Sequence, residues 1–397
     1  MSGRRQIMMA GGSGAIPIEG VRGVWWYASS GGPVLSSAMA ISGGTVGPFA
    51  HGGRGGLMQV YSGGSAVEQA VSSGVINVSS GGVATSAVVT SGGTVTVSGG
   101  GVANEPIVLR GGTCLVYGGV VSGAVLLEPG VAGRMTISGG GVAVGCMTRS
   151  YNFVVQNSGV ASNTTLQVIG QLIVQNGGTA YDVVMSGSNL SCYLGGYVSG
   201  VDNRSGTVRC SGVVEGAVVH HSAVVLSGGV MRSTTTVSGA VVVSSGGLVH
   251  VASAASGGAY HVRDGGSAID MHIYEGCFLH VSGGGVVDSA VVTGNGARLL
   301  ISSGGVASAV TVADSGYVNI YSGGILSGCI ASNGGYIYPK DGGVTYTTIV
   351  ESGGHMTVSS GGSADITTVK SGGYMHILAG GVATNITSET GATVIYH

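Results

Sequence analysis

The chain has 397 residues, of which 81 are glycine and 6 are proline, and 44% of its residues are hydrophobic. This hydrophobic fraction is too high for a flexible linker or a disordered segment, so the glycines must belong to a folded chain. Only 8% of the residues are charged, with 14 Lys and Arg against 16 Asp and Glu, which excludes the basic surface that nucleic acids and anionic lipids attract. Glycine and serine interrupt every apolar run before the roughly 18 residues that a membrane-spanning helix needs.

The first 28 residues differ from the rest of the chain. They begin MSGRRQIMMAGGSGAIPIEG and include Trp25 and Trp26. Their first apolar run ends before Gly11, so we expect no signal-peptide core here. We expect residues 1–28 to form an N-terminal segment or cap, followed by one repeat domain over residues 29–397.

Gly-Gly pairs or their equivalents recur about every 19 residues from about residue 43 onward. In the C-terminal half, one series of glycines stands at 228, 246, 265, 283, 304, 323, 342, 361 and 380. A second series stands at 239, 257, 276, 296, 316, 334, 353, 372 and 391. Each period is thereby divided into segments of roughly 11 and 8 residues, so nearly the whole chain is one repeat array.

The segments between these glycines have the pattern of strands. In SGGTVTVSGG at 91–100, Val95 and Val97 alternate with threonines, which is the period of a strand with one buried face. Glycine supplies the positive φ that tight turns between strands require. Because a unit this small cannot bury its own face, stacked units must share a core. The sequence therefore predicts an all-β fold, a single-stranded right-handed parallel β-helix (β-solenoid) of about 19 coils, the hand following from the preference of parallel crossovers.

Three segments carry a family resemblance: SSGGVATSAVVTSGGTVTVSGGGVA (79–103), NSGVASNTTLQVIGQLIVQNGGTA (157–180) and SSGGSADITTVKSGGYMHILAGGVATNIT (359–387). They resemble the imperfect 19-residue repeats of self-associating autotransporter adhesins of the diffuse-adherence type, from about residue 29 onward. The resemblance implies a secreted, non-enzymatic β-helical passenger on a bacterial surface that promotes adhesion, autoaggregation or biofilm formation. Its implied partners are further copies of itself, glycans or proteins of host or bacterial surfaces, and a glycosyltransferase.

The same resemblance implies glycosylation of serine hydroxyls, for which Ser80, Ser245, Ser303 and Ser360 are candidates. Serine before Gly-Gly also suits a tight turn by bonding the local backbone, so these positions do not require a modification. The sequence departs from the family in two further respects. The repeats continue to the final TGATVIYH without the strands of a membrane barrel, and six cysteines occur, at 114, 146, 192, 210, 277 and 329. Cys192 and Cys210 could form a disulfide between neighbouring coils or remain free as small buried residues.

Candidate binding residues follow from the parity of the shorter segments. In SGGYMHILAGG at 371–381, Met375 and Ile377 are predicted to point inward, and Tyr374 and His376 outward. The same register directs further rings outward, namely those of His261, Phe278, His280, Tyr317, Tyr336, Tyr338 and His355. Such a ladder suits sugar rings or a partner protein, although aromatic residues also stabilise neighbouring strands by stacking. His261 and His280 together lack the third ligand of a metal site, and we expect neither a metal nor a cofactor.

Two other functions remain open. Asp270 and Asp288 are predicted to hold the same place in successive coils with His272 nearby, and a separation of about 5 Å would suit a retaining glycosidase acting on a polysaccharide. A β-solenoid must also cover its terminal coils, and the strand-like ATVIY near the C-terminus has no polar cap. Stacking through uncovered ends would make the protein a structural filament or scaffold subunit.

Overall fold

The computed structural model describes residues 38–42, 45–46, 50–51, 57–61, 63–79, 81–90, 92–127, 133–149 and 152–397. The predicted segment 1–28, with Trp25 and Trp26, and also Ser80 lie outside these residues. The chain divides into two compact units, unit 1 with residues 1–153 and 158–161, and unit 2 with residues 154–157 and 162–397. Both units are parallel β-solenoids, as predicted, and their described residues make about 17 turns spaced about 19 residues apart. The described residues contain no helix, and hence none that could span a membrane.

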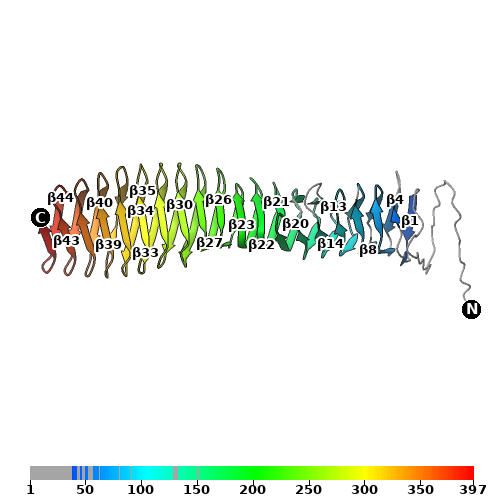
Figure 1. Cartoon of the computed structure of the whole chain (residues 1–397), viewed down its shortest axis with the longest axis horizontal. Helices are drawn as coiled ribbons and strands as arrows, with labels where there is room; N and C mark the ends of the chain where they lie inside the picture. Colours follow the sequence, from blue (N-terminus) through cyan, green and yellow to red (C-terminus); the bar gives the residue numbers. More distant parts are fainter. Residues whose placement is uncertain are drawn as a thin grey trace, which may run out of the picture. The chain divides into compact units, whose positions relative to one another are not determined.

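In Figure 1 the strands of unit 1 follow one another in chain order from blue to cyan. They pair into three columns, with one strand of each column in every turn. The first column contains β1 (Ala38–Ser42), β4 (Leu57–Tyr61), β7 (Val75–Val78), β10 (Thr94–Ser98), β13 (Thr113–Tyr117) and β16 (Arg134–Ser138). The second contains β2 (Thr45–Val46), β5 (Ser65–Val67), β8 (Val83–Thr85), β11 (Val102–Asn104), β14 (Val120–Ser122) and β17 (Val142–Val144). The third contains β3 (Ala50–His51), β6 (Ala70–Ser72), β9 (Val88–Thr90), β12 (Ile107–Val108), β15 (Val125–Leu126) and β18 (Met147–Thr148). Next in the sequence come β19 (Asn152–Val155) and β20 (Val160–Gln167).

Unit 2 alternates short strands with longer strands that bend near their middle. The short strands are β21 (Gln171–Val174), β26 (Ser222–Val225), β28 (Ala240–Val243), β30 (Ala259–Val262), β32 (Phe278–Val281), β34 (Arg298–Ile301), β36 (Tyr317–Ile320), β39 (Tyr336–Pro339), β41 (His355–Val358), β43 (Tyr374–Ile377) and β45 (Thr393–Tyr396). The longer strands are β27 (Val230–Val237), β29 (Leu248–Ala255), β31 (Ser267–Ile273), β33 (Val286–Thr293), β35 (Val306–Ala313), β40 (Val344–Val350), β42 (Ser363–Val369) and β44 (Val382–Ser388). Two turns split the longer strand, into β24 (Val213–Glu215) and β25 (Val218–Val219), and into β37 (Ile325–Ser327) and β38 (Ile330–Ala331); β22 (Thr179–Cys192) and β23 (Tyr197–Cys210) each join a long and a short strand.

Strands of neighbouring turns pair in parallel and in register. Val95 lies opposite Cys114 in unit 1, and Met356 lies opposite Met375 in unit 2. Side chains at the same place in successive turns therefore stack, and the inward columns form the core. Val95, Val97 and Met375 are fully buried and Ile377 is 6% exposed, which confirms the predicted parity.

The two glycines of a turn have different tasks. Gly342 has φ +82°, a left-handed conformation that costs glycine nothing because it has no Cβ. Gly343 has an ordinary φ, but a Cβ there would overlap the carbonyl oxygen of Ile320 in the preceding turn. The first glycine thus permits the bend, and the second allows successive turns to approach closely enough to form hydrogen bonds.

The cysteines follow the same register. Cys192 and Cys210 lie directly opposite each other on β22 and β23, as the spacing predicted. All six cysteines are free and buried. Burial raises the pKa of the Cys192 thiol to about 11 and that of the Cys210 thiol to about 12, so both are protonated at neutral pH and behave as small buried residues.

The longer strands of unit 2 bend at one residue with positive φ. This residue is Val251 (φ 53°), Asp270 (φ 54°), Thr347 (φ 51°) and Ile366 (φ 55°) in β29, β31, β40 and β42. In β29 the bend places His250 and Val251 outward in succession, and Ala252 then points inward again. The bend thus resets the alternation, and at Val251, Thr347 and Ile366 the corner residue is β-branched, for which the left-handed region is costly.

Replacing Thr347 by glycine should therefore stabilise unit 2. Gly328 and Asn385 hold the corresponding corner in other turns, both with positive φ. Relieving the left-handed strain at Thr347 should raise the free energy of unfolding by roughly 1 kcal/mol, measured as a shift of the urea unfolding midpoint. Thr368→Gly, at an outward position of β42 without positive φ, is the control and should destabilise by about 0.5–1 kcal/mol. If both variants lost the same free energy of unfolding, the left-handed strain at Thr347 would be contradicted.

Candidate functional site

The nine ring residues predicted to point outward all lie on one face of unit 2. This face consists of the outward positions of β30, β32, β34, β36, β39, β41 and β43, and we call it the short-strand face. In each of these strands the second and fourth residues are buried in the core, and the first and third lie on the outward side, although Ala259 and Asn319 are only 5% and 7% exposed there. The register of neighbouring strands aligns these outward residues into two columns.

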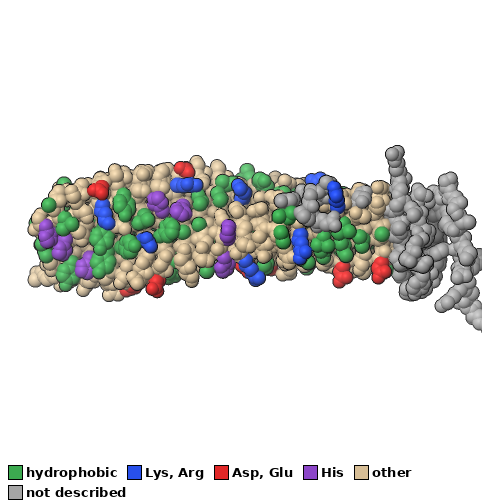
Figure 2. Space-filling view, in the orientation of Figure 1, with side chains coloured by type: hydrophobic (Ala, Val, Ile, Leu, Met, Phe, Trp, Pro, Cys, Tyr) green, Lys and Arg blue, Asp and Glu red, His purple; other side chains and the backbone are tan. Residues whose placement is uncertain are grey.

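The first column runs Ala259, Phe278, Arg298, Tyr317, Tyr336, His355, Tyr374, and the second runs His261, His280, Leu300, Asn319, Tyr338, Thr357, His376. In Figure 2, His and hydrophobic side chains lie side by side on the visible face of unit 2, with charged side chains scattered between them. The placement of the rings is thus as predicted, whereas their role in binding stays a prediction.

The rings nearest the C-terminus form a continuous stack. The ring centroids of Tyr336 and His355 are 4.9 Å apart with an interplanar angle of 18°, and those of His355 and Tyr374 are 5.0 Å apart at 10°. Tyr338 lies beside Tyr336 at 6.0 Å. Because the ring faces cover one another along the column, a ligand approaching from solvent meets mainly their edges, which carry the phenolic hydroxyls and imidazole nitrogens.

A second ring cluster lies on β30 and β32. His261 meets Phe278 edge-to-face at 5.3 Å and His280 at 6.1 Å. The His280 Nε2 atom lies 3.0 Å from the Ser302 hydroxyl. Arg298 and Leu300 of the next turn separate this cluster from the C-terminal stack, so the predicted single ladder is two ring clusters.

Two cationic side chains that the sequence did not single out for binding, Arg298 and Lys340, lie beside rings of this face. The Arg298 guanidinium lies 6.0 Å from the Tyr317 ring, and the Lys340 ammonium lies 5.1 Å from the Tyr338 ring and 5.8 Å from the Tyr321 ring. Lys340 and Tyr321 belong to turns that follow short strands, outside the alternating segments on which the prediction was based. Cation–π attraction holds both cations on this face.

Packing lowers the basicity of two histidines. Burial, and then the neighbouring His280 and Arg263, lower the pKa of His261. Burial, and then His376, lower the pKa of His355. Both rings therefore favour the neutral form, which can both donate and accept a hydrogen bond. Within the described residues no group of three or more His, Cys, Asp or Glu side chains could hold a metal ion.

The predicted carboxylate pair is not aligned. Asp288 lies opposite Ile269, and Asp270 therefore falls opposite Ser289. The discrepancy arises because the turn before β33 contains three glycines, and Gly284 rather than Gly283 lies beside Gly265. The residue that matches the corner Asp270 is therefore Ser289. Asp270 instead approaches His250, with 3.3 Å between Oδ2 and Nε2, and Asp288 accepts a hydrogen bond from Ser308. The prediction that the two aspartates share one place was wrong by one residue.

The candidate serines that the structure describes are accessible. Ser245, Ser303 and Ser360 are exposed at turns that follow short strands. A glycosyltransferase could reach these hydroxyls without unfolding the solenoid, so the implied modification stays a prediction that the geometry permits.

Comparisons with known proteins add little to this geometry. No protein-family model matches the sequence, and no curated protein matches it. Among solved structures, the TibC-catalyzed hyper-glycosylated TibA fragment is similar at 25% identity, covering 84% of this chain and 97% of that chain with a TM-score of 0.37. The A-module of the mannuronan C-5 epimerase AlgE4 of Azotobacter vinelandii is similar at 14% identity, covering 91% of this chain and 88% of that chain with a TM-score of 0.20. Both TM-scores are low, so neither likeness carries an inference about function.

The histidine packing predicts loss of stability on acidification. The pKa values of His261 and His355 are lower in the folded chain than in the unfolded chain. Below the unfolded value of about 6.5, the unfolded chain binds more protons, so stability falls as the pH falls. The melting temperature should drop between about pH 7.5 and pH 5, and it should drop less in a His261→Gln, His355→Gln variant. Equal drops in the two proteins would show that these histidines are not responsible.

Proposed function

We propose that this chain is a non-enzymatic adhesion or self-association module that binds through the short-strand face of unit 2. The observation that carries the proposal is the arrangement of tyrosine and histidine at outward positions in successive turns, held by stacking at 4.9 and 5.0 Å. Parallel, in-register pairing repeats similar groups at each turn, about 4.8 Å apart along the column. A partner with its own periodic surface, including a second copy of this chain, meets many equivalent contacts at once.

The mechanism we propose is multivalent. Tyrosine and histidine rings have few rotatable bonds, and their mutual stacking restricts them before a partner arrives, so little conformational entropy is lost on binding. Phenolic hydroxyls, imidazole nitrogens and the cations of Arg298 and Lys340 supply polar contacts along the face. Each contact is weak, but contacts fixed on one rigid solenoid act together through their high effective concentration.

We further propose that the module acts outside the cell or at a bacterial cell surface, with surface glycans, proteins or its own copies as partners. The support comes from the repeats that resemble self-associating autotransporter adhesins, as in residues 359–387. The exposure of Ser245, Ser303 and Ser360 supports the action of a glycosyltransferase.

The alternatives drawn from the sequence have less support. A polysaccharide-active enzyme would need Asp270 and Asp288 in matching places, and the register separates them by one residue. Stacking through the solenoid ends, which would make the protein a filament or scaffold subunit, stays a prediction.

Removing the C-terminal ring cluster should weaken association without unfolding the chain. We expect a variant with Tyr336, Tyr338, Tyr374 and His376 replaced by serine to self-associate at least about 10-fold more weakly in sedimentation velocity, because one lost anchor contact corresponds to about 1.4 kcal/mol. The matched control replaces Tyr181, Tyr193, Tyr346 and His221, which are exposed elsewhere in unit 2. If the four-serine variant folds and still self-associates as strongly as the wild type, the short-strand face is not the binding surface.

Surface display can be tested on cells of the native organism. Protease treatment of intact cells should release repeat peptides, and mass spectrometry should find hexose- or heptose-sized additions on serine in peptides that contain Ser245, Ser303 or Ser360. Repeat peptides that appear only after lysis would contradict the proposed location, whereas unmodified released peptides would contradict only the glycosylation.

A further inference from the structure

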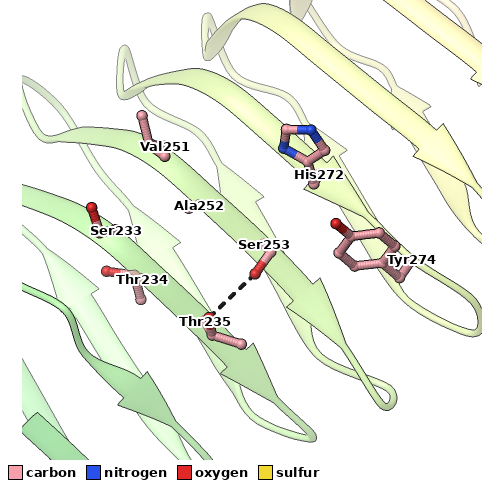
Figure 3. Close-up of a pocket in the computed structure, with 8 residues that line it drawn as sticks. All are labelled: Ser233, Thr234, Thr235, Val251, Ala252, Ser253, His272 and Tyr274. Atoms are coloured by element: carbon pink, nitrogen blue, oxygen red, sulfur yellow. Dashed lines mark hydrogen bonds between the residues drawn. The ribbon is translucent and has the colours of Figure 1, made fainter.

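A shallow hollow lies on a different face of unit 2, beyond the corners of β27, β29 and β31. Its volume is about 210 Å³, below the roughly 300–1,000 Å³ of pockets for drug-sized ligands. Figure 3 shows its floor of small side chains and the two rings beside them. The floor contains Ser233, Thr235 and Ser253, Val251 lies at its edge, and His272 and Tyr274 form a wall.

The in-register stacking explains why a hollow exists here. Thr235, Ser253 and His272 occupy the same outward place in three successive turns. The small residues Thr235 and Ser253 are thus followed by the large ring of His272 in the next turn. The change in side-chain size between these neighbouring turns makes the step from floor to wall. Tyr274 follows the end of β31 and stacks beside His272, with ring centroids 6.2 Å apart and an interplanar angle of 24°.

The wall and the floor have different chemistry. Tyr274 is 44% exposed and His272 is also exposed, so both rings have surface available for a ligand. The floor presents hydroxyls, and the Ser253 hydroxyl donates to the Thr235 hydroxyl at 3.3 Å (Figure 3). Hydroxyls both donate and accept hydrogen bonds.

The hollow has no charged lining side chain. The nearby Asp270 carboxylate lies at the corner of β31 and is already paired with His250 at 3.3 Å. An ionic ligand would lose hydration here without gaining a partner of opposite charge. The hollow therefore favours a neutral ligand that combines an apolar face with several hydroxyls.

We propose that this hollow binds one pyranose ring of a neutral saccharide. The apolar face of the sugar packs against the wall formed by Tyr274 and His272, and its hydroxyls bond to the floor hydroxyls of Ser233, Thr235 and Ser253. The proposal uses no residue of the short-strand face, so it does not rest on the proposed function. It adds a saccharide subsite to a face that the sequence did not single out for binding.

The test is saturation-transfer-difference NMR of the full chain with methyl β-D-glucopyranoside. A ligand of about 13 non-hydrogen atoms at ordinary ligand efficiency gives a Kd of roughly 1 mM, and we expect transfer to the ring protons of the sugar that saturates in this range. Sorbitol, an open-chain polyol without a ring face, is the ligand control and should show no transfer. Absence of transfer at about 20 mM glycoside, well above that Kd, or equal transfer to sorbitol, would overturn the proposal.

Variants locate the site. Tyr274→Ala should weaken binding at least about 10-fold, and Thr235→Val should weaken it while preserving side-chain shape. Tyr346→Ala, which removes a tyrosine that is 41% exposed on β40, should leave binding unchanged. If Tyr274→Ala fails to fold, His272→Ala tests the same wall. Binding that survives Tyr274→Ala or His272→Ala, but is lost in the Tyr336, Tyr338, Tyr374 and His376 variant, would assign the saccharide to the short-strand face and refute the hollow.

Discussion

The hydrogen bonds between successive turns determine where every side chain of each solenoid unit lies. They hold neighbouring parallel strands about 4.8 Å apart, and this spacing places identical positions of successive turns in direct contact. It also explains the second glycine of the Gly-Gly pairs. At Gly343 the backbone passes so close to the Ile320 carbonyl that no Cβ fits, so serine or alanine could supply a turn but could not replace this residue without separating the turns. The high glycine content is thus a requirement of close stacking.

The same spacing gives the outer surface its properties. On the short-strand face, rings in consecutive turns come within stacking distance, as at Tyr336, His355 and Tyr374. Stacking covers the ring faces and brings imidazoles near one another, which helps to lower the pKa of His261 and His355. At these two rings, burial within the column and a neighbouring imidazole both disfavour protonation.

Parity was sufficient to predict the fold, the core valines and the outward placement of all nine ring residues, because each short strand lies between two glycine turns and keeps a strict alternation. It failed where alternation is interrupted. The left-handed corner at Asp270 resets the inward and outward positions, and a pattern of period two cannot show which residue takes that conformation, particularly when Val251 or Ile366 does so against its own preference. The aspartate alignment was wrong by one residue for a separate reason: the turn at 283–285 has a third glycine, and Gly284 rather than Gly283 lies beside Gly265. Lys340 and Tyr321 were missed because they belong to turns, where side-chain direction does not follow from alternation.

The hollow beside Tyr274 could not be predicted from the sequence, because its residues lie in different turns. None of its residues forms a motif along the chain, since Thr235, Ser253 and His272 are 18 or 19 residues apart and meet only through the register. The core beneath them consists of inward residues such as Ala254 and Ile273, which alternate with the outward positions and are constrained separately. A single outward substitution can therefore open or close a hollow while the solenoid remains intact. Binding specificity in such a protein consequently depends on which large and small outward residues follow one another in the same column of successive turns.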